Sequence, residues 1–395
     1  MVSILDTDLY KFSTSYAYMK LFPDSECTFT YVDRNRKKRD QDFLNRFKQR
    51  LRQIEDVKLT DAEFDWCVKH IPYIPQCYWE WLRGFRFEFD KINVGLDEDG
   101  VLYMNVTDKT YKASLYEIPC LYLVPQTENS MKPIDWDATF NDLDRKLVIA
   151  EMNQLMFSEF GTRRRFNYQV QDEIITRIKH WMIDNPKATC VGTSNVHFAM
   201  KYNMKPIGTH PHEWFMFHGA QYGFKNANYM ALENWVKVYD GDLGIALSDT
   251  YTSDVFFNNF SLKLAKLYDG VRQDSGDEYE FIDKTVEFYK KRKIDPLTKT
   301  IVFSNALTFP KAEQIKNYCE GKIKCSFGIG TNLTCSVFGT DGMIYDAENH
   351  VMKMTRCRMN SNCPWYETIK LSDDIGKHLG SDELVTHAKF ELGIK

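Results

Sequence analysis

The chain has 395 residues, a hydrophobic content of 43% and a formal net charge of −4, so it can bury a large core as two domains or as one elaborated barrel. The near balance of 51 basic and 55 acidic side chains gives no reason to expect a nucleic acid partner. No stretch approaches the roughly 18 apolar residues that a membrane helix needs, and the acidic, polar N-terminus does not resemble a signal peptide, so no membrane association is expected. The ten cysteines are scattered without a C-x-x-C pair, which predicts reduced thiols in a cytoplasmic enzyme rather than a zinc ribbon.

The first 125 residues have the pattern of a mixed domain with an antiparallel sheet. The expected elements, in chain order, are a helix over 8–21, a strand over 26–32, a helix over 43–54, a helix that begins at a capping box over 60–63, and strands over 85–89 and 101–106. The acidic cluster over 97–100 ends in glycine and predicts a hairpin turn before the last strand.

The middle of the chain alternates short apolar runs with helical patterns. We expect helices over 143–160 and 169–183, and strands at 188–191, 207, 243–247, 267–271, 300–303 and 325–327. Such βα alternation predicts a parallel sheet, closed or open. After about residue 335 the sequence becomes β-rich again, so we predict an α+β domain over 1–125 that is joined by 336–395, and an α/β barrel over 126–335.

The segment from Ile207 to Trp214 crowds two imidazoles, a carboxylate and an indole into one turn. Histidine is the side chain most readily used for proton transfer or nucleophilic attack near neutral pH. His212, which stands next to Glu213, is the better catalytic candidate, whereas a structural role is expected for His210. A His210-x-His212 metal pair is an alternative, although no further ligand set stands out.

Polar clusters follow several of the apolar runs, as in a barrel whose chemistry lies at the strand ends. The run 272–277 combines a cation, carboxylates and a hydroxyl, which suits a sugar phosphate. Glycines in the run 328–332 permit close backbone approach to a phosphate, but the pattern is not a dinucleotide fingerprint. The run 192–195 offers hydroxyls, an amide and N–H groups to an anion, or is an ordinary turn.

Aromatic and basic residues leave alternatives open. Tyr10, near a helix start, either packs in the core or offers its face to a flat ligand. Phe160 and Arg163 either belong to a helix C-terminus, where cations complement the dipole, or supply stacking and an anion partner. The basic run that begins at Arg34 is either a solvated surface or an attraction for a polyphosphate.

Taken in order, these pieces resemble the nicotinate phosphoribosyltransferase family. The resemblance covers nearly the whole chain and is carried by TDLYK, EFGTRRR, VGTSNV, GTHPHEW, LSDTY, VRQDSGD, FSNAL, FGIGTNLT and KLSDDIGK. It implies an irregular α/β barrel with a second, discontinuous α+β domain made from both chain ends. It also implies an enzyme of NAD biosynthesis that joins nicotinate to 5-phosphoribosyl pyrophosphate, with coupled ATP hydrolysis through a phosphohistidine. Mg²⁺ would bind with the pyrophosphate substrate, without a dedicated protein cage.

The resemblance also implies site residues. His212 would be the phosphorylated histidine, and Asp249 the carboxylate that orients it. Phe160 would form one side of a ring sandwich, and Tyr10 of the neighbouring subunit in a homodimer would form the other. The remaining substrate-binding residues would be Arg163, Ser194, Asn195, Arg272 and Asp274. The phosphate-binding residues would be Arg34, which reaches the neighbouring site, and Ser304, Asn305, Gly328, Gly330, Thr331 and Asn332.

One loop bears on the choice of substrate. The close relative that uses nicotinamide has a carboxylate there, whereas this chain has Thr193, Ser194 and Asn195. A negative side chain would repel the carboxylate of nicotinate, so its absence from the loop favours the acid as substrate. The alternatives are a relative that uses nicotinamide or quinolinate, a metal-dependent barrel hydrolase built on His210 and His212, and a non-catalytic nucleotide-binding scaffold.

Overall fold

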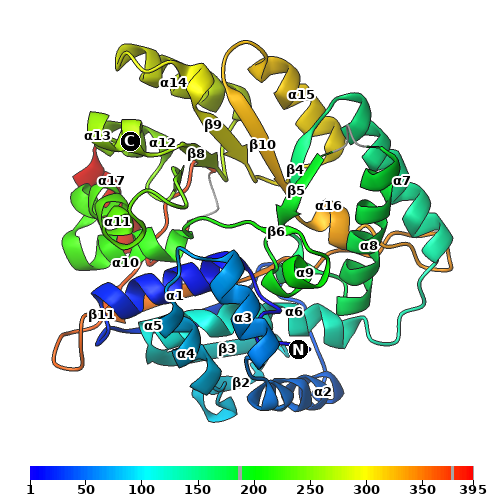
Figure 1. Cartoon of the computed structure of the whole chain (residues 1–395). Coiled ribbons are helices and arrows are strands. Elements are labelled where there is room, and N and C mark those ends of the chain that lie inside the picture. The colour runs from blue at the N-terminus through cyan, green and yellow to red at the C-terminus, as the bar shows by residue number, and fades with distance from the viewer. Residues whose placement is uncertain (186–188, 375–377, 395) are drawn as a thin grey trace.

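Seven parallel strands form a curled sheet in the order β6-β5-β4-β10-β9-β8-β7 (Figure 1). The structure is a computed structural model that describes residues 1–185, 189–374 and 378–394. The strands are β4 (Met156–Glu159), β5 (Thr189–Thr193), β6 (Lys205–Pro206), β7 (Ile245–Leu247), β8 (Gly270–Gln273), β9 (Thr300–Phe303) and β10 (Lys324–Ile329). Because β6 and β7 end the strand order without pairing to each other, the sheet is an open half-barrel.

Helices alternate with these strands and surround the half-barrel in Figure 1. They are α7 (Trp136–Met152), α8 (Tyr168–Asp184), α9 (Val196–Lys201), α10 (His212–Tyr222), α11 (Phe224–Tyr239), α12 (Ser253–Asn259), α13 (Leu262–Leu267), α14 (Glu278–Lys291), α15 (Phe309–Cys319) and α16 (Thr331–Thr334). Crossover connections of this kind bring the carboxyl ends of parallel strands to one edge of the sheet. Among the described residues, no helix has the length and apolar character needed to cross a membrane.

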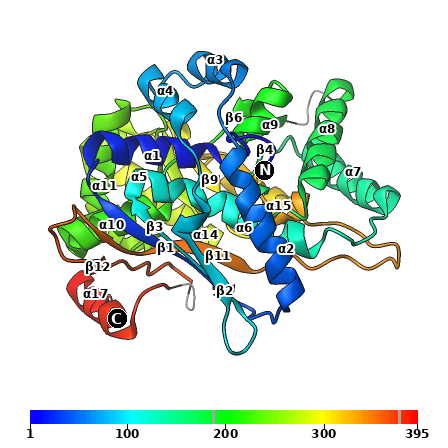
Figure 2. The same cartoon turned by 90° about the horizontal axis from the view of Figure 1, so that it is seen from below.

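A separate antiparallel sheet, with the order β12-β11-β1-β3-β2, joins the two ends of the chain (Figure 2). Its strands are β1 (Glu26–Asp33), β2 (Ile92–Leu96), β3 (Leu102–Lys109), β11 (His350–Arg358) and β12 (Tyr366–Glu367). The register of β1 on β11 runs from Glu26 opposite Arg358 to Asp33 opposite His350. The expected fold class, an α/β barrel with a discontinuous α+β domain, is therefore confirmed.

The helices outside the half-barrel come from the same two ends of the chain. They are α1 (Leu9–Leu21), α2 (Gln41–Arg52), α3 (Asp61–His70), α4 (Gln76–Gly84), α5 (Thr110–Ala113), α6 (Glu117–Glu128) and α17 (Asp382–Leu392). The expected capping box opens α3, with the Thr60 N–H donating to the Glu63 carboxylate at 2.8 Å. The expected hairpin turn joins β2 to β3, and Gly100 there has a φ of +79°. The helix α17 was not expected from the sequence.

Two expected elements are wrong. The helix expected over 143–160 ends at Met152, and the chain turns at Gln154, which has a φ of +48°, before it becomes β4. The arginines after Gly161 therefore do not follow a helix, which removes the helix-dipole interpretation. The strand expected over 85–89 has no strand partner. A side chain takes the place of a strand partner: the Glu88 N–H donates to the Tyr116 hydroxyl at 2.9 Å.

Two expectations fall partly outside the described residues. The strand expected over 188–191 appears as β5 from Thr189, and residue 188 lies outside the described residues. The motif KLSDDIGK is described up to residue 374, and 375–377 lie outside the described residues.

A buried ion pair ties the N-terminal segment to the loops of the half-barrel. Both oxygens of Asp6 accept from the Arg165 guanidinium at 2.8 Å, and the side chain of Arg165 is 1% exposed. The Asn195 amide also donates to Asp6, at 2.9 Å. Although burial opposes ionisation, the charge and hydrogen bonds of Arg165 lower the pKa of Asp6. The pair thus holds the segment before α1 against the loops that follow β4 and β5.

We expect Asp6→Ala to lower the free energy of unfolding by roughly 3–5 kcal/mol, because it leaves the Arg165 guanidinium buried without its partner. Asp61→Ala, which removes an exposed ion pair with Arg83, is the matched control and should cost less than about 1 kcal/mol. Urea unfolding followed by tryptophan fluorescence measures both variants. Equal, small losses for the two would contradict a structural role of the buried pair.

Candidate active site

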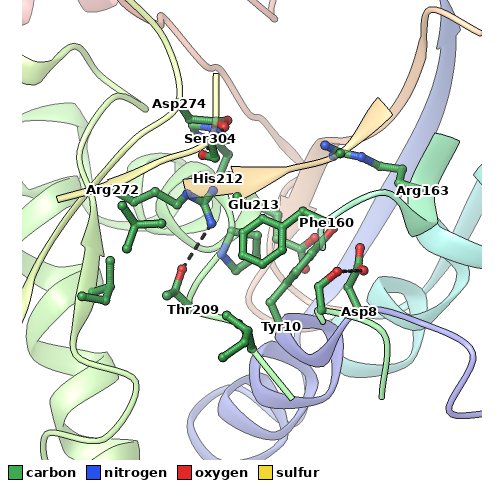
Figure 3. A pocket seen from close by; sticks show the side chains of 18 of the residues that line it. Asp8, Tyr10, Phe160, Arg163, Thr209, His212, Glu213, Arg272, Asp274 and Ser304 are labelled. Atoms are coloured by element: carbon green, nitrogen blue, oxygen red, sulfur yellow. Dashed lines mark hydrogen bonds and ion pairs between the residues drawn. The ribbon is translucent and has the colours of Figure 1, made fainter. Parts of the chain in front are cut away.

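A cavity of about 500 Å³ lies where the carboxyl ends of the parallel strands meet α1 and the antiparallel sheet (Figure 3). The half-barrel contributes Phe160 after β4, Ser194 after β5, Thr209 after β6, Arg272 on β8, Asp274 after β8, Ser304 after β9, and Gly330 and Thr331 after β10. Asp8, Tyr10 and Lys353 line the cavity from the α+β domain. This edge of the sheet is where α/β barrels carry their ligands.

Phe160 and Tyr10 both line the cavity (Figure 3). The Phe160 N–H donates to the Ile329 carbonyl at 2.8 Å, which places the phenyl ring over Gly328. A Cβ atom at Gly328 would lie 2.4 Å from that ring, so the contact requires glycine. Aromatic side chains that line a cavity suit a flat ring as ligand.

Tyr10 reaches the cavity from its own chain. The Leu9 N–H donates to the Ser194 carbonyl at 2.7 Å, and this bond holds the start of α1 against the loop after β5. Tyr10 and Phe160 line the cavity within one chain, and the role of Tyr10 in the site of a neighbouring subunit stays a prediction.

A buried charge cluster lies beneath the aromatic pair. The Lys11 ammonium is fully buried and contacts the carboxylates of Glu117 and Glu213. The Ser114 hydroxyl donates to Glu213 at 2.6 Å. Burial raises the pKa of Glu213, whereas the two carboxylates raise the pKa of Lys11 against the effect of burial. Arg163 lies at the cavity side of the cluster, with its guanidinium 3.8 Å from Glu117.

An acidic side chain lies at the loop over 193–195. The Ser194 hydroxyl donates to Asp8 at 2.7 Å, and Asp8 also lines the cavity (Figure 3). Asp8 is 5% exposed, and burial raises its pKa, while the charge of Arg163 acts in the opposite direction. The lack of an acid within residues 193–195 therefore does not by itself decide between an acid and an amide as substrate.

His212 opens α10, and both of its ring nitrogens have partners. Nδ1 lies 2.9 Å from the Thr250 hydroxyl. Nε2 lies 3.0 Å from the Asp274 carboxylate and 2.9 Å from the Lys370 ammonium. Asp249, expected to orient the imidazole, is farther away, at 3.9 Å from Nε2. Burial and then the charge of Lys370 lower the pKa of His212 to about 4, so the ring is neutral near pH 7 and keeps one nitrogen lone pair.

His210 is a core residue. Its ring centroid lies 5.0 Å from those of Phe215 and Trp235, and its Nδ1 accepts the Leu247 N–H at 3.4 Å. Burial lowers the pKa of His210 to about 3. The hydrolase alternative, which needs His210 and His212 to share a metal ion, does not fit this arrangement.

A different set of possible metal ligands does meet. The donor atoms of His212, Asp249 and Asp274 all lie within 4.8 Å of one another. In the described part of the chain, Asp249 Oδ1 is buried without a hydrogen-bond partner. Carboxylate oxygens are the donors that Mg²⁺ prefers, so Asp249 and Asp274 fit a magnesium ion that arrives with a polyphosphate.

Several residues that the resemblance assigned do not line the cavity. They are Arg34, Asn195, Asp249, Asn305 and Asn332. The Asn195 side chain is used inside the protein, where it donates to Asp6 and caps α9 by accepting the Phe198 N–H. Arg34 is exposed, and its pKa is lowered by partial burial and by the charge of Arg163, which places it near the cationic end of the cavity.

Sequence reasoning missed Asp8, Thr250, Lys353 and Lys370. Burial, followed by the charges of Lys370, Arg34 and Arg163, lowers the pKa of Lys353 to about 7. Such crowding of cations at one end of the cavity favours a polyanionic ligand. Lys370 begins the motif KLSDDIGK, so that motif was the one signal that pointed to it.

The fold is that of an α/β-barrel enzyme, and the lining of its cavity suits a flat ring and a polyanion. Comparison with known proteins identifies the family. The model of the Nicotinate phosphoribosyltransferase (NAPRTase) family matches residues 155–393, and that of the NAPRTase N-terminal domain matches residues 5–125. This chain belongs to the nicotinate phosphoribosyltransferase family.

Individual relatives match over their full length. The nicotinate phosphoribosyltransferase of Chromohalobacter salexigens is 40% identical over 395 residues, which covers 99% of this chain and 98% of that protein. That of Methanosarcina mazei is 36% identical and covers 100% of this chain and 98% of that protein. The crystal structure of the enzyme from Porphyromonas gingivalis has a TM-score of 0.95 at 41% identity, with 100% of both chains covered.

We expect Gly328→Ala to raise the KM for nicotinate about three- to tenfold, because the added methyl group displaces the Phe160 ring and weakens an aromatic contact of about 0.5–1.5 kcal/mol. Gly84→Ala is the matched control, since nothing lies within 4 Å of the added Cβ atom. Steady-state kinetics of the two variants measure the effect. An unchanged KM in Gly328→Ala would show that the ring substrate does not bind against Phe160.

The His212 imidazole should stay neutral down to about pH 5 and titrate near pH 4, because its pKa is lowered from the ordinary 6.5. Nitrogen-15 NMR of histidine-labelled protein gives the titration curve, and His212→Ala identifies the resonance. A midpoint near 6.5 would mean that the ring is well solvated and that this description of its surroundings is wrong.

Proposed function

We propose that this enzyme forms nicotinate mononucleotide and pyrophosphate from nicotinate and 5-phosphoribosyl pyrophosphate in NAD biosynthesis, with ATP hydrolysis coupled through a phosphohistidine at His212. The observation that carries the proposal is the meeting, in one cavity, of two aromatic side chains with a neutral imidazole held between a carboxylate and an ammonium. Relatives that are named for the transferase reaction and match along the whole chain support it.

The nucleophile of the transfer is the pyridine nitrogen of nicotinate, which carries its own lone pair and needs no general base. Phe160 and Tyr10 hold the ring so that this nitrogen faces the anomeric carbon of the ribose. Arg163 also lines the cavity and supplies the positive charge for the carboxylate of nicotinate. The site therefore positions the ring rather than activating it.

The new bond joins the pyridine nitrogen to the anomeric carbon, and the bond from that carbon to pyrophosphate breaks. Pyrophosphate leaves with the electron pair, so positive charge develops on the sugar and negative charge on the leaving group. Asp274 supplies the carboxylate near the sugar, and Arg272 and Lys353 supply cations for the phosphates. Mg²⁺, when bound with the pyrophosphate at Asp249 and Asp274, would neutralise further charge.

ATP enters the proposal through the lone pair of His212. Transfer of the γ-phosphoryl group to this ring places about two negative charges at the edge of the cavity. That charge changes the affinity of the cavity for the sugar pyrophosphate, and loss of the phosphoryl group resets it. The coupling is thus a change of affinity at one site, with no separate domain for ATP hydrolysis.

The proposed homodimer rests on the family resemblance, and light scattering of the purified protein tests it. The proposed cytoplasmic location is supported by the ten free cysteines, which are typical of a reducing compartment.

The purified enzyme with nicotinate, 5-phosphoribosyl pyrophosphate and Mg²⁺ should make nicotinate mononucleotide, and ATP should increase the rate. We expect His212→Ala to lose ATP hydrolysis and phosphoryl labelling from γ-labelled ATP, while slow synthesis without ATP remains. Chromatography of the mononucleotide and counting of the labelled protein measure the two activities. Parallel reactions with nicotinamide and with quinolinate determine the preferred substrate.

His180→Ala is the matched control, since His180 is exposed on α8 and should leave both activities at the level of the unaltered enzyme. Labelling retained in His212→Ala would overturn the phosphohistidine assignment. Absence of mononucleotide with every base, with or without ATP, would overturn the transferase function and leave the nucleotide-binding scaffold as the better description.

A further inference from the structure

The segment from Lys370 to Asp374 crosses from the antiparallel sheet to the carboxyl edge of the half-barrel. The Leu371 N–H donates to the Thr250 carbonyl at 2.8 Å. Asp373 accepts the Ser253 N–H at 2.9 Å, and Asp374 accepts the Gly276 N–H at 2.9 Å. The segment is therefore fixed to two loops of the site by contacts that do not involve the side chain of its first residue.

These contacts place the Lys370 ammonium next to the His212 imidazole. Its Nζ lies 2.9 Å from His212 Nε2 and 3.7 Å from Asp249, and its side chain is 7% exposed. An ammonium has only donors, so its hydrogen bond to Nε2 requires the lone pair to be on that nitrogen. The proton of the neutral ring is then on Nδ1, where the Thr250 hydroxyl, 2.9 Å away, can accept it.

Asp274 favours the opposite tautomer. Its carboxylate lies 3.0 Å from the same Nε2 atom and accepts only, so its hydrogen bond requires the proton to be on Nε2. In that tautomer the nitrogen beside the two carboxylates has no lone pair to offer. Lys370 and Asp274 thus compete for the protonation state of one nitrogen, and Thr250 accommodates either outcome because a hydroxyl both donates and accepts.

We propose that Lys370 is a catalytic residue of the phosphoryl transfer, which keeps Nε2 of His212 free for attack on the γ-phosphate of ATP and then pairs with the phosphoryl oxygens. The proposal rests on the phosphohistidine put forward above. In the step, the Nε2 lone pair forms the bond to phosphorus, and the bond from phosphorus to the β–γ bridging oxygen breaks. ADP leaves with that electron pair, and the ring keeps its proton on Nδ1 against Thr250.

The charge balance of the product gives Lys370 its second role. A phosphoryl group on Nε2 brings about two negative charges to a position beside the Asp249 and Asp274 carboxylates. Repulsion between these groups would oppose the transfer. An ammonium already in contact with Nε2 offsets it without any rearrangement, which is the condition under which electrostatic stabilisation is most effective.

The test compares Lys370→Gln, Lys370→Met and Lys370→Arg with the unaltered enzyme. Lys370→Met keeps the aliphatic stem and its packing, so it remains informative if the Gln variant does not fold. We expect the rate of His212 labelling by γ-labelled ATP, measured by rapid quench, to fall about 100-fold in the Gln and Met variants. Lys370→Arg, which restores the charge, should recover part of the rate. Lys290→Gln, at an exposed position on α14, is the matched control.

Nitrogen-15 NMR of the histidine ring supplies a readout that needs no ATP. We expect the proton to lie on Nδ1 in the unaltered enzyme and to move to Nε2 in the Gln and Met variants, where Asp274 acts alone. Labelling at an unchanged rate, or an unchanged tautomer, would overturn the role of Lys370. Absence of label in the unaltered enzyme would instead overturn the phosphohistidine itself, so the two failures are distinguishable.

Discussion

The Lys11 ammonium, buried between the carboxylates of Glu117 and Glu213, is the contact on which the geometry of the site depends. Lys11 follows Tyr10 on α1, and Glu213 follows His212 on α10. One ion cluster therefore sets the distance between Tyr10 and the His212 imidazole. Removing the cation would leave two carboxylates facing each other in the core, a loss of several kcal/mol. Burial, and then the charge of Glu117, raise the pKa of Glu213 against the opposing charge of Lys11.

The two ends of the cavity next to this ion cluster differ in charge. The end of the cavity that would hold the ring has aromatic side chains. The buried ion cluster of Lys11, Glu117 and Glu213 lies beneath them, and its charged groups pair with one another. At the phosphate end the pKa of Lys353 is lowered to about 7, because burial and the neighbouring cations both oppose its charge. His212 lies between the two ends, neutral and in contact with groups of both signs. The division matches a reaction that joins an uncharged ring nitrogen to a sugar while a polyanion departs.

The sequence predicted the class of fold because periodicity and turn chemistry are local. The hairpin turn that ends at Gly100 and the capping box at Thr60 are examples. The helix beyond Met152 was wrong because Leu155 and Phe157, both buried, fit a helical and a strand pattern equally well. The approach of Asp8 and of Lys370 to the site could not be predicted, since each depends on contacts between residues more than 100 positions apart.

The pairing of β1 with β11 has a consequence for the way the enzyme is made. β1 begins at Glu26, and the strand that covers its edge does not begin until His350, more than 300 residues later. During translation a growing chain therefore exposes an unpaired strand edge until β11 has been made, and such an edge is a template for aggregation. The enzyme should accordingly gain its active site only after β11 has been made, and holding chaperones should improve its yield in overproducing cells.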